Sequence, residues 1–157
     1  MKKNSFITGF IIIAAFFIVS SCNTNNMKTK KTDQEQSSLS PLQQENADKL
    51  VVLWTSADKE VAENMVFMYT LNSRINGWWD DVTFIVWGPS ANLLANDSTL
   101  QSGIKKFIQA GIKVEACKAC ADNYGVDEKL QSLGIDVKYM GTPLTGYIKD
   151  GYHILTF

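Results

Sequence analysis

The stretch Leu50-Val51-Val52-Leu53-Trp54-Thr55 is an apolar run of strand length, closed by one polar residue. Strands that are apolar on both faces are typical of parallel sheets with helices on both sides. Four more strand-like segments follow it: Val82–Trp87, Ile112–Ala116, Asp136–Met140 and His153–Phe157. Because helical patterns separate these segments, we expect βαβ units and an α/β fold with a mainly parallel sheet of about five strands.

A helix is expected between the first two of these strands. Ser56 or Asp58 can cap its start, and Gly77 suits the position just beyond its end near Asn76. Apolar side chains recur there at the spacing of one helix face. The positions expected to face the core are Val61, Met65, Met68 and Tyr69.

Weaker helix signals follow the second strand. Residues 91–97 are expected to form a loop with a short helical turn. Ser98 and Gln101 stand at capping-box spacing, which predicts the start of a longer helix at Ser98. Residues 127–133 read as a short helix, and Thr142-Pro143 reads as the cap and first residue of another.

The N-terminus has the pattern of a secretory signal peptide. Lys2 and Lys3 precede an apolar region of 14 residues, Phe6–Val19, which is shorter than the ~20 residues of a membrane span. Small residues and then Cys22 follow, and this order resembles a bacterial lipobox. We expect residues 1–21 to be removed and Cys22 to carry a lipid. An ordinary signal peptide and a short uncleaved anchor are the alternatives.

The rest of the chain divides into two parts by composition. Residues 22–48 are almost entirely polar, so we expect a flexible tether that starts at the lipidated Cys22. Residues 49–157 hold the strands and helices of the folded domain. A lipid on Cys22 would place the protein in the cell envelope, anchored to a bacterial membrane, with the choice between inner and outer membrane left open.

Charge and composition argue against several classes of function. A net charge of −1 gives no basic excess for binding nucleic acid, while 45% apolar residues suffice for a core. A single histidine, His153, and a single C-x-x-C cannot complete a four-ligand zinc site, so no metal is expected. No G-x-G-x-x-G and no Walker loop occur, so no nucleotide cofactor is expected either.

Two cysteines form the constellation with the clearest chemistry. Cys117 and Cys120 directly follow the third expected strand, and lipidation of Cys22 would leave them as an isolated pair. A thiol just after a strand and near a helix N-terminus can have a lowered pKa, to which Lys118 can add. A thiolate accepts sulfur, and a second thiol can resolve a persulfide or close a disulfide. The alternatives are a small structural disulfide and two buried cysteines with no role.

The cysteine pair shares its edge of the expected sheet with several other small and polar residues. In open α/β sheets, ligands bind outside the carboxyl ends of the strands. The residues that we take as a candidate binding pocket there are Thr55, Ser56, Gly88, Pro89, Ser90, Asp122, Tyr124 and Thr142.

The stretch Cys117-Lys118-Ala119-Cys120-Ala121-Asp122-Asn123-Tyr124-Gly125 resembles the motif of the DsrE/DsrF-like family. It is most similar to the branch of YedF-like C-terminal domains, whose motif reads C-G-T-C-x-D-x-Y-G. The preceding Ala110–Glu115 also matches the family's helix end and third strand. The resemblance covers about residues 49–157 and implies a compact three-layer α/β/α domain that often forms homo-oligomers. Lys118-Ala119 stands where the family motif has Gly-Thr.

The resemblance also implies a role in sulfur relay, in which the first cysteine of the motif carries a persulfide. That role falls on Cys117, with Cys120 as the partner thiol. We therefore expect a membrane-tethered sulfane-sulfur carrier or thiol-redox protein, whose partners are further copies of itself and a sulfur donor or acceptor protein. The alternative is a non-catalytic ligand-binding or assembly module with a structural Cys117–Cys120 disulfide.

Overall fold

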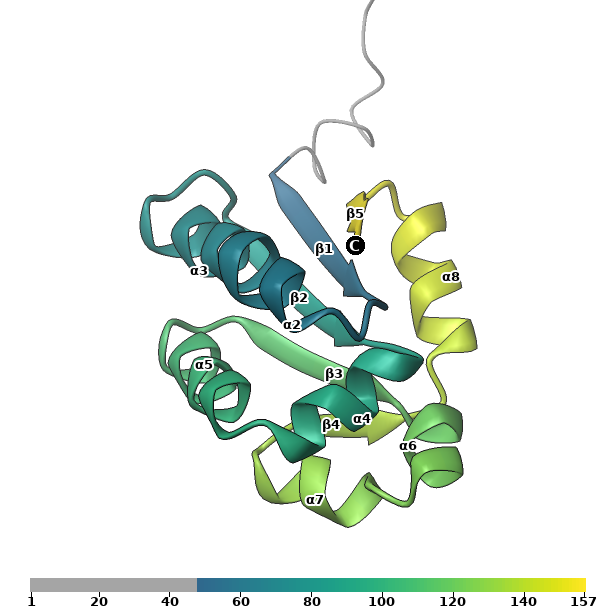
Figure 1. Ribbon diagram of the computed structural model, residues 1–157. Coiled ribbons are helices and arrows are strands. Elements are labelled where there is room, and N and C mark those ends of the chain that lie inside the picture. Colours follow the sequence, from purple (N-terminus) through teal and green to yellow (C-terminus); the bar gives the residue numbers. More distant parts are fainter. Residues whose placement is uncertain (1–47) are drawn as a thin grey trace, which may run out of the picture. The chain divides into compact units, whose positions relative to one another are not determined.

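The computed structural model describes residues 48–157, which form an α/β fold around a five-stranded sheet (Figure 1). All four pairs of neighbouring strands are parallel, in the order β4-β3-β2-β1-β5. The strands are β1 (Lys49–Trp54), β2 (Asp81–Val86), β3 (Lys113–Cys117), β4 (Asp136–Lys138) and β5 (His153–Thr156). The expected five-stranded α/β fold is confirmed, and only the fourth strand is clearly shorter than its pattern.

Helices connect the strands and pack around the sheet. They are α2 (Lys59–Val61), the π-helical η1 (Ala62–Phe67), α3 (Met68–Ile75), α4 (Pro89–Asn96), α5 (Ser98–Gln109), α6 (Lys118–Tyr124), α7 (Asp127–Ser132) and α8 (Gly141–Lys149). Figure 1 shows α8 on the opposite side of the sheet from α3 and α5. The helices thus form two unequal layers, with α8 in the thinner one.

The larger core lies on the sheet face that we call the major face. Alternate residues of β1, namely Leu50, Val52 and Trp54, point into it and are buried. Four aromatic rings tie its layers together, because Trp54 meets Phe67 of η1 at 5.4 Å and Phe84 of β2 meets Phe107 of α5 at 5.0 Å between centroids. Burial of such rings supplies a large share of the hydrophobic stabilisation.

The opposite face, here called the minor face, has a small buried cluster made of Val51, Ile85, Cys117 and Met140. Helix α8 packs against it through half-buried side chains such as Leu144, and no residue of α8 is fully buried. Cys117 therefore belongs to the smaller and more thinly covered of the two cores.

The first helical segment buries a different face from the one expected. Met65 and Met68 are each 53% exposed and Val61 is 37% exposed, while Tyr69, the fourth expected residue, is partly buried and packs against the core. The fully buried side chains are Ala62, Val66, Phe67, Thr70 and Ser73. The hydroxyls of Thr70 and Ser73 donate to carbonyls of their own helix, at 2.6 and 2.8 Å. Because these polar groups are satisfied locally, they enter the core, and a search for apolar residues alone selects the wrong face.

Helix starts also differ from the patterns. Residues 91–97, expected to be mostly loop, belong largely to helix α4. Asp97, and not Ser98, caps α5, since its Oδ1 accepts hydrogen bonds from the backbone N–H groups of Thr99 and Leu100. Thr142 lies inside α8, which begins one residue earlier at Gly141. A carboxylate one residue upstream of a serine can take over the capping role.

The N-terminal expectations fall outside the described residues. The signal peptide, the lipidated Cys22 and all but the last residue of the tether lie in residues 1–47. Within residues 48–157, no helix has the length and apolarity needed to cross a membrane.

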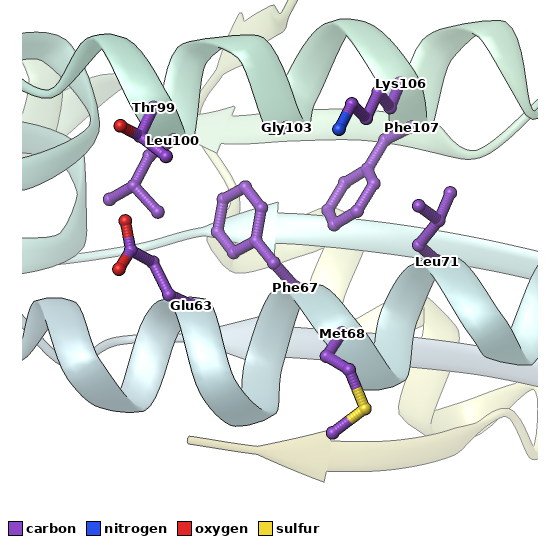
Figure 2. A pocket seen from close by; sticks show the side chains of 9 residues that line it. All are labelled: Glu63, Phe67, Met68, Leu71, Thr99, Leu100, Gly103, Lys106 and Phe107. Carbon is purple, nitrogen blue, oxygen red and sulfur yellow. The ribbon is translucent and has the colours of Figure 1, made fainter.

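One close contact sets the spacing between η1 and α5. Gly103 of α5 faces the ring of Phe67, and a Cβ built on Gly103 would lie 2.5 Å from Cδ1 of that ring. Figure 2 shows the ring of Phe67 directed at Gly103, within a groove of about 360 Å³ between the two helices. The glycine lets the aromatic ring approach the backbone of α5.

The variant Gly103→Ala should therefore lose stability by about 1–3 kcal/mol, because the added methyl group must displace Phe67 from a packed site. Gly146→Ala in α8 is the matched control, since nothing lies within 4 Å of its Cβ position and Ala is favoured over Gly in a helix by about 0.5–1 kcal/mol. Chemical denaturation of both variants measures the difference. Equal effects of the two substitutions would contradict the packing argument.

The position of the α5 cap gives a second test. Asp97→Ala should lower the midpoint of thermal unfolding, because it removes the cap and also the ion pair with Lys59 at 2.8 Å. Ser98→Ala should leave the midpoint nearly unchanged, since the Ser98 side chain makes no cap contact. A larger loss in the unfolding midpoint for Ser98→Ala than for Asp97→Ala would instead support the capping box expected at Ser98.

Candidate functional site

The two motif cysteines meet at the carboxyl end of β3. Cys117 is the last residue of that strand and the N-cap of α6, and Cys120 lies in the first turn of the helix. Helical side chains lean toward the helix N-terminus, so the Cys120 thiol turns back and reaches the Cys117 thiol. Both cysteines are free thiols here. The two cysteines of the C-x-x-C motif therefore have their sulfur atoms next to each other.

The two thiols differ in exposure. Cys117 is 4% exposed and belongs to the minor-face cluster, while Cys120 is partly buried and packs against that cluster. Burial raises the pKa of the Cys120 thiol, and the adjacent Cys117 raises it further. The backbone N–H of Gly88 acts in the opposite direction, because it faces the Cys120 sulfur. The net effect favours a protonated Cys120 at neutral pH.

Gly88 reaches this position through an unusual backbone conformation. It lies between β2 and α4 with φ 73° and ψ −139°, a region that is almost closed to residues with a side chain. The turn at Gly88 brings the end of β2 against the first turn of α6. One residue without a side chain thus contributes a backbone donor to the thiol pair.

Lys118 does not serve the thiols in the way that the sequence suggested. Its ammonium lies 2.8 Å from Asp122 and 3.0 Å from Asp127, and these hydrogen bonds raise its pKa. Its positive charge is therefore committed to two carboxylates. Asp122 is engaged in this ion pair and holds the Lys118 side chain along the surface of α6.

A buried carboxylate lies on the same face of β3 as Cys117. Glu115 is fully buried, and the ammonium groups of Lys113 and Lys138 lie 2.6 and 2.7 Å from its Oε1. The hydroxyl of Tyr147 in α8 donates to the same carboxylate at 3.2 Å. This group, here called the Glu115 cluster, connects β3 and β4 to the helix that covers the minor face.

The Glu115 cluster was not predicted from the sequence, because the residue pattern around Glu115 indicates a strand face exposed to water. Lys113 and Glu115 alternate with apolar residues, which is typical of a strand face exposed to water. The face is closed only because α8 packs over it from 32 residues further along the chain. The one feature of the sequence that could have indicated the cluster is the opposite charge of Lys113 and Glu115 on the same strand face.

Two predicted pocket residues hold the strand ends together. The Ser90 hydroxyl is fully buried, accepts from the backbone N–H of Trp87 at 3.1 Å and lies 2.7 Å from the carbonyl of Trp54. The Thr55 hydroxyl donates to the carbonyl of Phe157 at 2.7 Å. These contacts satisfy backbone groups where β1, β2 and β5 end. The Ser56 hydroxyl likewise accepts from a backbone N–H of the next turn.

The remaining predicted pocket residues fall in two separate places. Pro89 and Tyr124 share a hollow of about 300 Å³ at the carboxyl edge of the sheet; its full lining is Ala57, Pro89, Asn92, Leu93, Asn96 and Tyr124. Thr142 lies instead in an open hollow along α8, together with Gly141, Thr145, Gly146 and Lys149. The structure thus brings Gly88, Cys117 and Cys120 together and keeps Thr142 apart from the Pro89–Tyr124 hollow. No group of three or more His, Cys, Asp or Glu side chains in residues 48–157 could hold a metal ion.

Comparison with known proteins gives one family and several similar structures. The model of the DsrE/DsrF-like family matches residues 48–157. No curated protein matches the chain. A conserved protein of unknown function from Bacteroides thetaiotaomicron, BT1422, has 47% sequence identity and a TM-score of 0.69, over 71% of this chain and 96% of the other.

Two more distant structures share the fold. The ychN protein from E. coli has 15% identity and a TM-score of 0.56, over 70% of this chain and 99% of its own. A protein of unknown function from Methanobacterium thermoautotrophicum, MTH1491, has 18% identity and a TM-score of 0.55, over 70% of this chain and its whole length. At such identities the likeness concerns the fold alone.

The Glu115 cluster predicts a large effect of a small substitution. Glu115→Gln should lower the free energy of unfolding by about 2 kcal/mol, because two ammonium groups and a hydroxyl lose a charged acceptor in a buried place. Glu63→Gln is the control, since Glu63 is partly exposed and lies 3.5 Å from a single lysine. Denaturant unfolding at neutral pH measures both, and a Glu115→Gln variant as stable as the control would contradict the role of the cluster.

The same cluster should make stability depend on alkaline pH. Hydrogen bonds to Glu115 and Tyr147 raise the pKa of Lys113 above its ordinary value of 10.5. Burial lowers the pKa of Lys138, but hydrogen bonds to Asp136 and Glu115 outweigh it and the net direction is upward. A raised lysine pKa stabilises the fold fully below pH 10.5, and this stabilisation is lost as the pH rises further. Glu115→Gln should flatten that alkaline loss.

Proposed function

Since the chain belongs to the DsrE/DsrF-like family over residues 48–157, we propose that it is a sulfane-sulfur carrier or thiol-redox protein that acts through Cys117. The observation that carries this proposal is the contact between two free thiols where β3 ends. That edge of a parallel sheet is where α/β proteins place their reactive groups. A persulfide on Cys117 would be the sulfur-carrying form.

The surroundings of the pair support different roles for the two thiols. Cys120 has a raised pKa and therefore keeps its proton near neutral pH. The Cys120 thiol lies directly against the Cys117 thiol, so a sulfur atom can pass from one to the other. We assign the persulfide to Cys117, the first cysteine of the motif, and the role of partner thiol to Cys120.

We further propose that the protein lies in the cell envelope. A lipid on Cys22 tethers the domain to a bacterial membrane through the polar segment 22–48. In that oxidising compartment the Cys117–Cys120 pair cycles between dithiol, disulfide and persulfide, unless a reductant holds it as the dithiol. Its partners are other copies of the chain and a protein that donates or accepts sulfur.

A second candidate function is a non-catalytic ligand-binding or assembly module with a structural Cys117–Cys120 disulfide. The low exposure of Cys117 favours it, because buried cysteines are often inert. Such a disulfide closes a very short loop, so the chain-entropy model gives it a modest stabilising effect. Under this second function, reduction of the pair should lower the thermal unfolding midpoint, whereas a redox pair should be reduced with little change.

Sulfur loading tests the main proposal. After exposure to inorganic polysulfide, removal of the excess and a wash with glutathione, the full chain should hold one additional sulfur atom, and peptide mapping by mass spectrometry should place it on Cys117. Cys117→Ser should lose this stably held sulfur, because it lacks the accepting thiol. Cys22→Ser is the control with one other cysteine removed and should load normally. Unchanged sulfur retention in Cys117→Ser would overturn the proposal.

A further inference from the structure

The thiol that we propose as the sulfur carrier is also the less accessible one of the pair. Cys117 is 4% exposed, and its neighbours in the minor-face cluster include Val51 and Ile85, which have no exposed surface, and Met140 with 1%. A sulfur donor must bring its terminal sulfur into line with the attacking thiolate. The 4% of Cys117 that is exposed leaves such a donor little surface to approach.

Cys120 occupies the boundary of the same cluster. It packs against the buried residues on one side and keeps part of its surface exposed on the other. Its thiol contacts Cys117 directly, so no other residue needs to move for sulfur to pass between them. Within residues 48–157, these two are the only thiols.

Resting on the proposed function, we infer that Cys120 is the thiol through which sulfur enters and leaves, and that Cys117 is the buried storage thiol. In the first transfer, Cys120 gives its proton to solvent and its thiolate attacks the outer sulfur of a donor persulfide R–S–SH. The Cys120–S–SH bond forms, the donor S–S bond breaks, and the donor leaves as the thiol R–SH after protonation. No external oxidant or reductant is consumed.

The second transfer runs inside the site. Cys117 gives up its proton and its sulfur attacks the outer sulfur of the Cys120 persulfide. The Cys117–S–SH bond forms, the S–S bond at Cys120 breaks, and the Cys120 sulfur takes up the released proton. The Gly88 N–H faces the Cys120 sulfur and stabilises its anionic form at the moment when it leaves. Release to an acceptor thiol is the reverse sequence. The class of donor and acceptor is thus any low-molecular-weight or protein persulfide that can reach Cys120.

Storage on a buried thiol has a consequence that a single exposed thiol would not give. Small thiols reduce a persulfide by attacking its sulfur atoms, and such an attack needs the same approach as loading. Sulfur on Cys117 is therefore protected from small thiols for as long as Cys120 closes the approach. Sulfur on Cys120 is open to them.

The test compares Cys120→Ser with Ala119→Ser in the full chain, the latter adding a hydroxyl at an exposed neighbouring position of α6 without removing a thiol. Loading from inorganic polysulfide is followed over time by intact mass. Cys120→Ser should load Cys117 at least about tenfold more slowly than wild type, which corresponds to about 1.4 kcal/mol, and Ala119→Ser should load at the wild-type rate. Cys117→Ser should take up sulfur on Cys120 quickly and lose it to added glutathione.

A second measurement on the wild-type protein keeps the inference independent of sulfur chemistry. Under native conditions, iodoacetamide should alkylate Cys120 before Cys117, as read by peptide mapping. Loading of Cys120→Ser at the wild-type rate, or faster alkylation of Cys117, would overturn the entry role of Cys120. If wild type takes up no sulfur at all, the proposed function fails, and the alkylation order alone then decides which thiol is accessible.

Discussion

The placement of the thiol pair depends on how the domain buries one carboxylate. A charged group without water around it must be compensated, and Glu115 is compensated by Lys113, Lys138 and Tyr147 together. Each of these partners comes from a different element: Lys113 from β3 itself, Lys138 from β4 and Tyr147 from α8. The carboxylate therefore fixes the relative position of two strands and the helix above them.

That arrangement extends directly to Cys117. In the pairing of β3 with β4, Cys117 stands opposite Lys138, and Glu115 stands opposite Asp136. The side chains of Glu115 and Cys117 lie on one face of the strand, since they are two residues apart. A helix that is anchored over Glu115 is thereby held over the minor face to which Cys117 belongs. The charged cluster and the thiol pair form one structural unit.

The order of strands and helices was predictable because it follows from periodicity and from strong local signals. The unbroken apolar run at β1, the capping Asp58 and the left-handed Gly77 all act over a few residues. The wrongly chosen face of the first helix has another cause. Whether Thr70 and Ser73 are buried depends on what packs against them. Their hydroxyls can be buried because they donate hydrogen bonds to backbone carbonyls of the helix.

The candidate site was predictable to a similar degree. The spacing of Cys117 and Cys120 after a strand, and the carboxyl edge on which they lie, follow from the sequence. The difference in exposure between them does not, because it is set by Met140 and by α8, which come later in the chain. Nor does the sequence reveal that the hydroxyls of Ser90 and Thr55 are hydrogen-bonded to backbone carbonyls, since those carbonyls lie 36 and 102 residues away in the chain.

Gly88 carries an implication for how such sites change during evolution. It meets the Cys120 sulfur with a backbone N–H, and its φ of 73° and ψ of −139° suit glycine almost alone. A mutation at position 88 would thus change the surroundings of the Cys120 thiol without adding or deleting any titratable side chain. A comparison of relatives that considers only nucleophiles, acids and bases would pass over this position, although its backbone N–H faces one of the two thiols.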